Sequence, residues 1–315
     1  MGEHNAPPTA HRSHSRRLRS LLFVPGDSER KQLKAITVGA DALILDLEDS
    51  VAVSQLPIAR AQVAKFIGSR TGQALPELWV RVNSLSSGHM LQDLSAVLRA
   101  PASPAGIVLP KITNAAEIAE VSHYLSAFET SRDLPLGHTR VLVLVGETPD
   151  AFLKLSRLAQ ELRVMPSVLG RVEALTWGSE DLGAILGTLS RENTQGELIL
   201  PFQMARSICQ ASAAALNVQA IDTVYTAIQD IAGLERELGN ARRDGFTGKM
   251  VIHPSHVAAV NRAFAPTEAE LDYARRIVAA FELTPDAGVV NLNGQMVDRP
   301  HFVKARRLLT SLIDH

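Results

Sequence analysis

The sequence predicts a (β/α)8 barrel, because short apolar runs alternate eight times with helical stretches over about 245 residues. Several runs, such as ALILDL and VLVLV, are almost continuously apolar, which is typical of parallel strands buried on both faces. The alternative is an open, doubly wound sheet. That fold usually carries a glycine-rich phosphate loop after its first strand, whereas FVPGDSER follows the first run here. We therefore expect the closed barrel.

The expected strands are the apolar runs at 20–24, 42–47, 78–82, 106–109, 141–145, 172–177, 218–224 and 250–252. The expected helices have apolar residues at helical spacing or recognisable start signals, and lie at 29–38, 57–67, 114–128, 149–162, 201–216, 230–243, 255–264 and 267–283. Pro57 suits a first helical turn, and Asn114 with Glu117 forms a capping pair. The link after the sixth strand is short and glycine-rich, near 181–189.

The alternation of strands and helices divides the chain into three segments: a leader at 1–18, the barrel at 19–284 and an extension at 285–315. The leader is rich in histidine and arginine and lacks the apolar core of a secretory signal, so we expect it to be disordered. In the extension, Asn293-Gly294 predicts a hairpin turn, and 301–313 predicts an amphipathic helix. A barrel does not need such a piece, so it must cover its own barrel mouth or pack on another subunit.

Composition excludes several classes of protein. Lys plus Arg is 32 and Asp plus Glu is 33, which argues against nucleic acid as a partner. No apolar run approaches the ~18 residues of a membrane helix. The single cysteine, Cys209, cannot form an internal disulfide, so a reducing, cytoplasmic location is expected.

Charged or ionisable residues follow six of the eight expected strands. In a barrel of this kind, the carboxyl ends of the strands form the rim that carries the chemistry. Any one such residue is usually a solvated loop residue or a helix cap, but six in one ring are harder to explain in that way. The residues are Asp46, Glu48, Asp49, Arg81, Lys111, Glu147, Glu180, Asp181 and His253.

Several carboxylates on one rim repel one another unless a cation lies among them, and oxygen ligands select Mg²⁺ or Mn²⁺ rather than zinc. Because magnesium takes only one or two protein carboxylates, Glu147 and Asp181 on adjacent strands are the expected metal ligands. Asp46 and Glu48 are better placed as outer groups that hold the site in position.

Arg81 offers a planar, two-pronged donor for a substrate carboxylate. Its alternative role is a salt bridge to Glu48 or Asp46 across the mouth, and both roles are compatible. Lys111 at a strand end often only neutralises neighbouring charges. His253 precedes a proline, and a capping role is at least as well supported as a catalytic one.

Together, the segments RSLLFVPGDSERKQLKA, GADALILDLEDSVA, WVRVN, GIVLPK, VGET, LTWGSEDLGA, GFTGKMVIHPSHV and GQMVDRPHFVKARRLL resemble the citrate lyase beta-subunit-like proteins of the HpcH/HpaI aldolase group. The match runs in order from Arg19 to Leu309. The resemblance implies a TIM barrel in a trimer or hexamer. It also implies magnesium-dependent cleavage or formation of a carbon–carbon bond next to a CoA thioester, with malyl-CoA, methylmalyl-CoA, citramalyl-CoA or citryl-CoA as substrate.

The resemblance also implies roles for individual residues. It makes Glu147 and Asp181 metal ligands and Arg81 a substrate-binding residue, and we count Glu180 with the latter. The positions expected to contact CoA are Phe23, Lys34, Ile252 and His253. Asp298, in the MVDRP segment, corresponds to the acid that reaches a neighbouring subunit's site and handles the proton in malyl- and citramalyl-CoA lyases.

One departure stands out, because many relatives continue the metal glutamate as ETARG, whereas this chain has Thr148-Pro149-Asp150. The sequence therefore leaves substrate size and side-chain recognition open. A stand-alone lyase is favoured by Asp298 and the long tail. A citryl-thioester lyase beta subunit and a catalytically weak structural or regulatory member remain alternatives. An aldolase without CoA is disfavoured, because LDLEDSVA lacks the histidine base of that branch.

Overall fold

The computed structural model describes residues 17–70, 76–100 and 102–310, which form two compact units divided between Phe264 and Ala265. The predicted leader lies almost wholly outside the described residues. Its last residue, Leu18, is fully buried in the barrel unit, and its N–H donates to Gln219 Oε1 at 2.9 Å. The barrel unit therefore begins at Leu18.

The first unit is the predicted closed barrel of eight parallel strands, and β1 pairs with β8 to complete the ring. The closed ring excludes the open doubly wound sheet. The strands are β1 Ser20–Pro25, β2 Ala42–Asp46, β3 Glu77–Arg81, β4 Gly106–Ile112, β5 Arg140–Val145, β6 Val172–Trp177, β7 Gln219–Asp222 and β8 Gly248–Val251.

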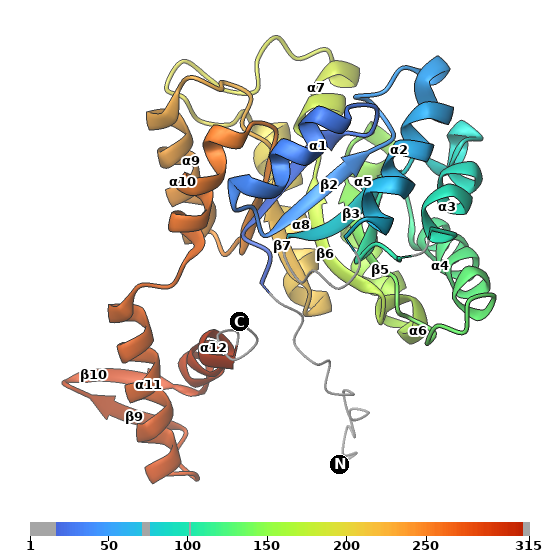
Figure 1. The fold of residues 1–315 in the computed structure, drawn as a ribbon. Coiled ribbons are helices and arrows are strands. Elements are labelled where there is room, and N and C mark those ends of the chain that lie inside the picture. The colour runs from blue at the N-terminus through green and yellow to red at the C-terminus, as the bar shows by residue number, and fades with distance from the viewer. Residues whose placement is uncertain (1–16, 71–75, 101, 311–315) are drawn as a thin grey trace. The chain divides into compact units, whose positions relative to one another are not determined.

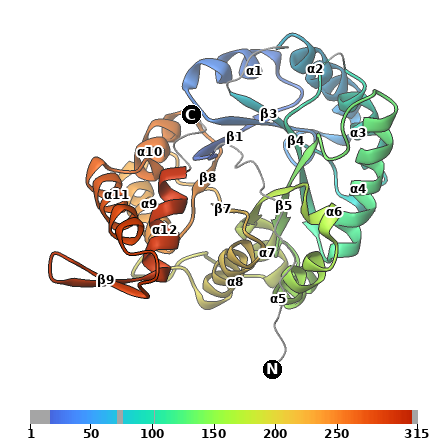
Figure 2. The same ribbon diagram turned by 90° about the horizontal axis from the view of Figure 1, so that it is seen from below.

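Helices surround the strands on the outside of this ring (Figures 1 and 2). They are α1 Glu29–Ala35, α2 Leu56–Gly68, α3 Met90–Leu98, α4 Ala115–Thr130, α5 Pro149–Arg163, α6 Pro166–Leu169, α7 Ser179–Leu186, α8 Leu200–Leu216, α9 Ile231–Arg243 and α10 Pro254–Phe264. Short 3-10 turns occur at η1 Ile36–Val38, η2 Val53–Gln55 and η3 Leu85–Ser87. Two predicted helix-start features are present: the Asn114 side chain accepts from Glu117 N–H, and Pro57 lies in the first turn of α2.

Strand side chains alternate between two cores, as the pleat requires. One face packs against the helices, and the other fills the barrel interior with residues such as Ile44, Trp79, Leu142 and Met250. Burial on both faces explains why the strands read as continuous apolar runs.

The sequence pattern does not predict α3 or α7. The buried residues of α3 do follow helical spacing, but the helix has only nine residues. In α7, Gly183 weakens the helical signal. A Cβ at Gly183 would lie 3.1 Å from the Phe202 ring, so glycine permits close packing against α8. Packing against α8 therefore favours a helix in this glycine-containing segment after β6.

The second unit contains α11 Glu268–Leu283, β9 Val289–Leu292, β10 Gln295–Asp298 and α12 Arg299–Thr310. The predicted Asn293-Gly294 turn joins the two strands, and both residues have positive φ, as a type I′ turn requires. Phe281 and Phe302 pack with ring centroids 5.2 Å apart. Because α11 shares this core, the unit starts at Ala265 rather than at the predicted residue 285.

No helix within residues 17–70, 76–100 and 102–310 has the length and apolarity that a membrane crossing requires.

A buried charge network links β7 and β8 to the helices outside them. Lys249 Nζ is fully buried, lies 3.5 Å from Asp222 Oδ2 and also pairs with Glu237 on α9. Asp222 further accepts from Trp177 Nε1 at 2.8 Å and pairs with Arg206 on α8 at 3.3 Å. Burial alone would raise the pKa of Asp222, but the charges of Lys249 and Arg206 hold it below its ordinary value.

We expect Lys249→Met to lower the free energy of unfolding by about 3 kcal/mol, because it leaves the buried Asp222 and the half-buried Glu237 without their lysine. Lys65→Met is the control, since Lys65 pairs with Glu29 at 3.1 Å on the surface and should lose less than about 1 kcal/mol. Urea denaturation measures both variants. Similar small losses would show that the buried network contributes little to stability.

Candidate active site

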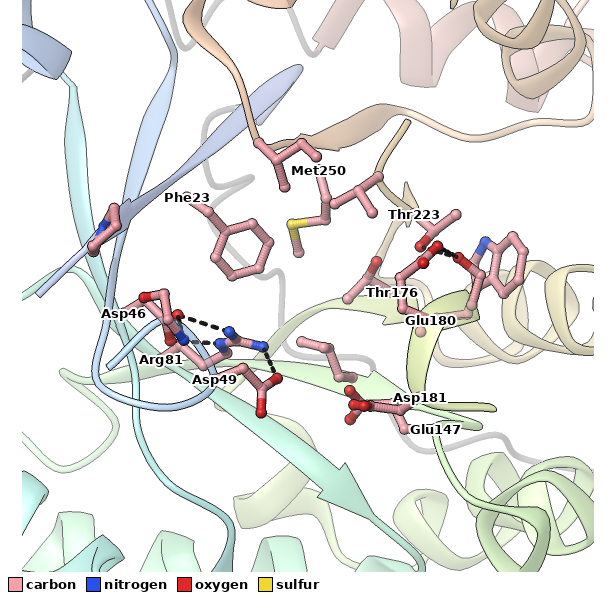
Figure 3. A pocket seen from close by; sticks show the side chains of 18 residues that line it. Phe23, Asp46, Asp49, Arg81, Glu147, Thr176, Glu180, Asp181, Thr223 and Met250 are labelled. Atoms are coloured by element: carbon pink, nitrogen blue, oxygen red, sulfur yellow. Dashed lines mark hydrogen bonds and ion pairs between the residues drawn. The ribbon is translucent and has the colours of Figure 1, made fainter. Parts of the chain in front are cut away.

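A cavity of about 420 Å³ opens at the carboxyl ends of the barrel strands (Figure 3). Charged residues and apolar residues share its walls. It is lined by Phe23, Pro25, Asp46, Asp49, Ser50, Arg81, Leu144, Glu147, Thr176, Trp177, Gly178, Ser179, Glu180, Asp181, Thr223, Val224, Met250 and Ile252. The structure thus brings seven of the predicted site residues to one cavity: Phe23, Asp46, Arg81, Glu147, Glu180, Asp181 and Ile252.

Arg81 ends β3 and is held by the acidic segment after β2. Its Nε and Nη2 donate to the two carboxylate oxygens of Asp46, each at 2.7 Å. Its Nη1 donates to Asp49 at 3.1 Å and lies 3.0 Å from Glu48 Oε2. The guanidinium also stacks over the Phe23 ring, 4.9 Å from the centroid. The salt bridge anticipated as an alternative role for Arg81 is therefore present.

This pairing fixes the charge state of both partners. Burial would raise the pKa of Asp46, but the hydrogen bonds and charge of Arg81 lower it below its ordinary value. Burial would lower the pKa of Arg81, but Asp46 and Glu48 raise it. Both groups are therefore ionised at neutral pH, and the two hydrogen bonds to Asp46 fix the position of the Arg81 guanidinium.

Lys111 lies at an irregularity in β4, where the register with β5 shifts between Leu109 and Ile112. It has a left-handed backbone conformation, with φ of 55°. This conformation turns its N–H onto Glu147 Oε2. Strand irregularities of this kind often re-aim groups beside active sites.

The Lys111 side chain is the second cation of the mouth. Its Nζ lies 2.9 Å from Glu48, 3.3 Å from Asp49 and 3.9 Å from Asp181. Burial lowers its pKa, but these carboxylates raise it by more, so the amine stays protonated. A protonated amine neutralises the mouth and does not act as a nucleophile.

Two buried carboxyl groups at the mouth have raised pKa values. Burial raises the pKa of Glu147 to about 8; the Lys111 N–H opposes this shift, and the charges of Glu48 and Asp181 add to it. Burial raises the pKa of Glu48 to about 7, against the charges of Arg81 and Lys111. The positive charges at the mouth therefore offset the effect of burial on these two carboxyl groups only in part.

Gly178 allows Glu147 to approach the end of β6. A Cβ at this position would lie 2.5 Å from Glu147 Cγ, so any larger residue would displace the carboxyl group. Glu147 and Asp181 point to the same part of the cavity in Figure 3.

The donors at this point suit a magnesium ion. Among the described residues, no group of three or more His, Cys, Asp or Glu side chains could hold a metal. Magnesium, however, typically needs only one or two protein carboxylates and completes its shell with water and substrate oxygens. Glu147 and Asp181 supply two oxygen donors. Burial is the main cause of the raised Glu147 pKa, the charges of Glu48 and Asp181 add to it, and a divalent cation at this point would favour the ionised carboxylate.

Four predicted residues lie outside the cavity lining. Glu48 pairs with the lining residue Arg81 and with Lys111. Lys34 is exposed in the last turn of α1. His253 is half-buried at the start of α10, and its Nδ1 lies 2.7 Å from Ser255 Oγ and accepts from Ser255 N–H, as in the anticipated capping role.

Asp298 belongs to the second unit, where it lies at the end of β10. Its carboxylate bonds His301 Nδ1 and accepts from His301 N–H at the start of α12. The hydrogen bond from His301 lowers the pKa of Asp298. Within this unit, Asp298 therefore caps a helix and is ionised.

The structure adds hydroxyl groups that the sequence reasoning missed. Thr176, Ser179 and Thr223 line the cavity beside Glu180. Thr176 is a polar residue inside the apolar run EALTW, on the same strand face as Ala174, and this was the available signal. The strand irregularity at Lys111 was not predicted either. Its available signal was Pro110, since proline within a strand often marks a bulge.

The unusual segment after Glu147 builds the start of α5. Thr148 accepts from Ala151 N–H at 3.2 Å, and Pro149 lies in the first helical turn. Asp150 is exposed and pairs with Lys154 at 2.7 Å. None of these three residues is among the cavity-lining residues of the described chain.

The chain is similar to known proteins along most of its length. The profile of the HpcH/HpaI aldolase/citrate lyase family matches residues 19–254. The mitochondrial citramalyl-CoA lyase of Rattus norvegicus is 34% identical over 297 residues, covering 93% of this chain and 85% of the relative. Citrate lyase subunit beta of Escherichia coli K12 is 34% identical over 299 residues, covering 94% and 93%.

A solved structure supports the same similarity. The crystal structure of protein CitE from Mycobacterium tuberculosis, in complex with magnesium, acetoacetate and coenzyme A, superposes with a TM-score of 0.71. It is 30% identical in sequence, and the match covers 94% of this chain and 98% of that one.

The raised pKa of Glu147 predicts how stability depends on pH when metal is absent. The unfolded chain loses this proton near pH 4.5 and the folded chain near pH 8, so the group makes the free energy of unfolding fall across that interval. Glu147→Gln should therefore be more stable than the wild type at pH 8, by at least about 1 kcal/mol, and similar at pH 4.

Glu129→Gln is the control with the opposite sign. Burial would raise the Glu129 pKa, but the paired Arg171 and backbone N–H groups lower it, so its contribution is present above pH 4.5 and lost at lower pH. This variant should be less stable than the wild type at pH 8. Urea denaturation in EDTA at pH 4 and pH 8 measures all three proteins, and a destabilised Glu147→Gln at pH 8 would contradict the prediction.

Proposed function

The chain belongs to the HpcH/HpaI aldolase/citrate lyase family, and we propose that it is a magnesium-dependent carbon–carbon lyase. Its substrate is a 3-hydroxyacyl-CoA of the citramalyl-CoA or malyl-CoA type. The products are acetyl-CoA, or another acyl-CoA, and a 2-oxo acid such as pyruvate or glyoxylate. The rat relative named for citramalyl-CoA and the CitE complex with magnesium and coenzyme A support this substrate class.

One observation carries the proposal: a pair of acidic oxygen donors, Glu147 and Asp181, shares a cavity with a rigidly held arginine. The carboxylates suit a hard cation, and Arg81 presents a permanent positive charge. A substrate with a carboxylate, a hydroxyl and a thioester oxygen matches this arrangement.

Cleavage in the retro-aldol sense breaks the bond between the hydroxyl-bearing carbon and the carbon next to the thioester. A magnesium ion held by Glu147 and Asp181 would supply Lewis acidity that lowers the pKa of the substrate hydroxyl and polarises the new carbonyl. Arg81, fixed by Asp46, stabilises the negative charge that develops on the thioester oxygen. Such preorganised charge requires no rearrangement during the reaction.

The CoA part of the substrate is assigned to the positions implied by the family. Phe23 and Ile252 line the cavity, whereas Lys34 and His253 lie outside its lining. The exposed ammonium group of Lys34 suits the phosphates of CoA.

We further propose that the chain forms a homotrimer or hexamer, in which residues from 285 onward cover a neighbour's barrel. Asp298 of that segment then protonates the enolate carbon, and it removes the same proton in the synthetic direction. This role requires that the neighbouring site release Asp298 from His301 and raise its pKa. A cytoplasmic location remains our prediction.

Two alternative functions would differ from this one in the substrates that the protein cleaves. A citrate lyase beta subunit would act on citryl thioesters of an acyl carrier protein, as the similarity to the Escherichia coli subunit suggests. A weak structural or regulatory member would turn over none of these substrates.

A substrate panel tests the proposed function. Malyl-, citramalyl-, methylmalyl- and citryl-CoA are incubated with magnesium, and the released 2-oxo acid is detected. We expect cleavage of a citramalyl- or malyl-type ester, loss of activity in EDTA and recovery with Mg²⁺ or Mn²⁺. The folded double variant Glu147→Gln, Asp181→Asn should be inactive. Activity only on carrier-protein thioesters would favour the beta subunit, and full activity in chelator would refute the metal site.

The role of Asp298 is tested with two variants. Asp298→Ala should lower turnover by about 10²–10⁴-fold, because it removes a general acid–base group. Asp298→Asn can still accept the hydrogen bond that caps α12 but cannot transfer the proton, so its loss should be equal. Normal turnover of Asp298→Asn would assign the residue to capping alone.

The shared site is tested by mixing Asp298→Ala with Arg81→Ala under conditions that exchange subunits. Some activity should return from the two inactive parents, since one subunit then supplies an intact barrel and another an intact Asp298. If exchange is demonstrated and no activity returns, the second unit does not serve a neighbour.

A further inference from the structure

We propose that Thr176 determines specificity in the proposed lyase, by bonding a neutral oxygen on the substituent of the hydroxyl-bearing carbon. This inference rests on the proposed function. It predicts that the site favours an oxo-acid fragment with a hydroxymethyl group over one with a methyl group.

The first observation is the isolation of a buried hydroxyl group. Thr176 lines the cavity and is fully buried, yet its Oγ1 has no hydrogen bond to any of the described residues. Its neighbours in register on the adjacent strands are Leu144 and Ile221, which offer no side-chain polar atom. A buried hydroxyl without a partner is costly. A ligand with an oxygen that accepts a hydrogen bond from this hydroxyl therefore binds more tightly.

The second observation is the depth of Thr176. It lies within β6, five residues before Asp181, and Leu144 lies three residues before Glu147. Thr176 and Leu144 are thus paired in register below the two proposed metal ligands. A substrate held at Glu147 and Asp181 would extend its small acid substituent toward this level, whereas bulky CoA enters from the open mouth.

The third observation is the charge around this end of the cavity. In Figure 3, Thr176 and Thr223 lie on the same side as Glu180, across from Arg81 and Asp46. Arg81 is the one basic residue among the described residues that line the cavity, and it is paired with Asp46. A second substrate carboxylate on the Thr176 side would therefore lie beside Glu180 with no basic residue of the lining on that side, so a neutral oxygen is favoured.

Thr223 provides a contrast within the same wall. Its Oγ1 lies 3.5 Å from Ser179 Oγ, and Ser179 in turn donates to Glu180 at 3.1 Å. Its hydroxyl already has a protein partner, so it has less to gain from a ligand than Thr176.

The experiment measures binding of 2-oxo acids directly, by titration calorimetry in magnesium buffer. Hydroxypyruvate, pyruvate and oxaloacetate are compared on wild type, Thr176→Val and Thr176→Ser. We expect wild type to prefer hydroxypyruvate over pyruvate by about tenfold. Thr176→Val should lose that preference through weaker hydroxypyruvate binding, with pyruvate changed less than about twofold, and Thr176→Ser should retain it.

Thr176→Val should fold with a melting temperature equal to or above that of the wild type, because it replaces a hydroxyl that has no protein partner. Thr223→Val is the matched control and should leave the preference in place. An unchanged preference in Thr176→Val, or an equal loss for all three acids, would overturn the proposal. Failure of every acid to bind wild type would instead count against the proposed function.

Discussion

The balance of charge at the barrel mouth is the constraint on which the site depends. Five carboxylates, from Asp46, Glu48, Asp49, Glu147 and Asp181, meet two cations, Arg81 and Lys111. Arg81 holds Asp46 ionised, whereas burial leaves Glu48 and Glu147 with raised pKa values. A divalent cation suits this ring because its charge would favour ionisation of the buried Glu147 beside Asp181.

The scaffold outside the mouth keeps this balance in place. The strained Lys111 backbone aims an N–H at Glu147, and Gly178 leaves room for the same carboxyl group. Trp177, just before Gly178, is held by the buried carboxylate of Asp222, which is neutralised by Lys249 and Arg206. Packing between the sheet and helices α8 and α9 therefore positions the end of β6, which leads into α7 and Asp181 in its first turn.

Arg81 already has a carboxylate partner within the protein. Its bond to Asp46 uses the two-pronged geometry that a substrate carboxylate would otherwise require. The arginine is consequently better suited to a fixed electrostatic role than to clamping a carboxylate. Thr176 is the reverse case, since its hydroxyl lies in the same cavity with no partner among the described residues. Arg81 and Thr176 lie on opposite sides of the cavity.

The sequence by itself determined the barrel, the strand order and most of the acidic rim, because strands buried on both faces leave continuous apolar runs such as ALILDL. It also located the Asn293-Gly294 turn, which depends on local backbone preference. Only tertiary structure decided which rim residues meet: Asp46 binds Arg81 from the next strand, and Lys111 reaches Glu147 through a local bulge. It also assigned α11 to the second unit, because α11 and α12 share an apolar core that spacing along the chain does not reveal. Periodicity records which face of an element is buried, whereas partners across strands depend on register and backbone irregularities that no single segment encodes.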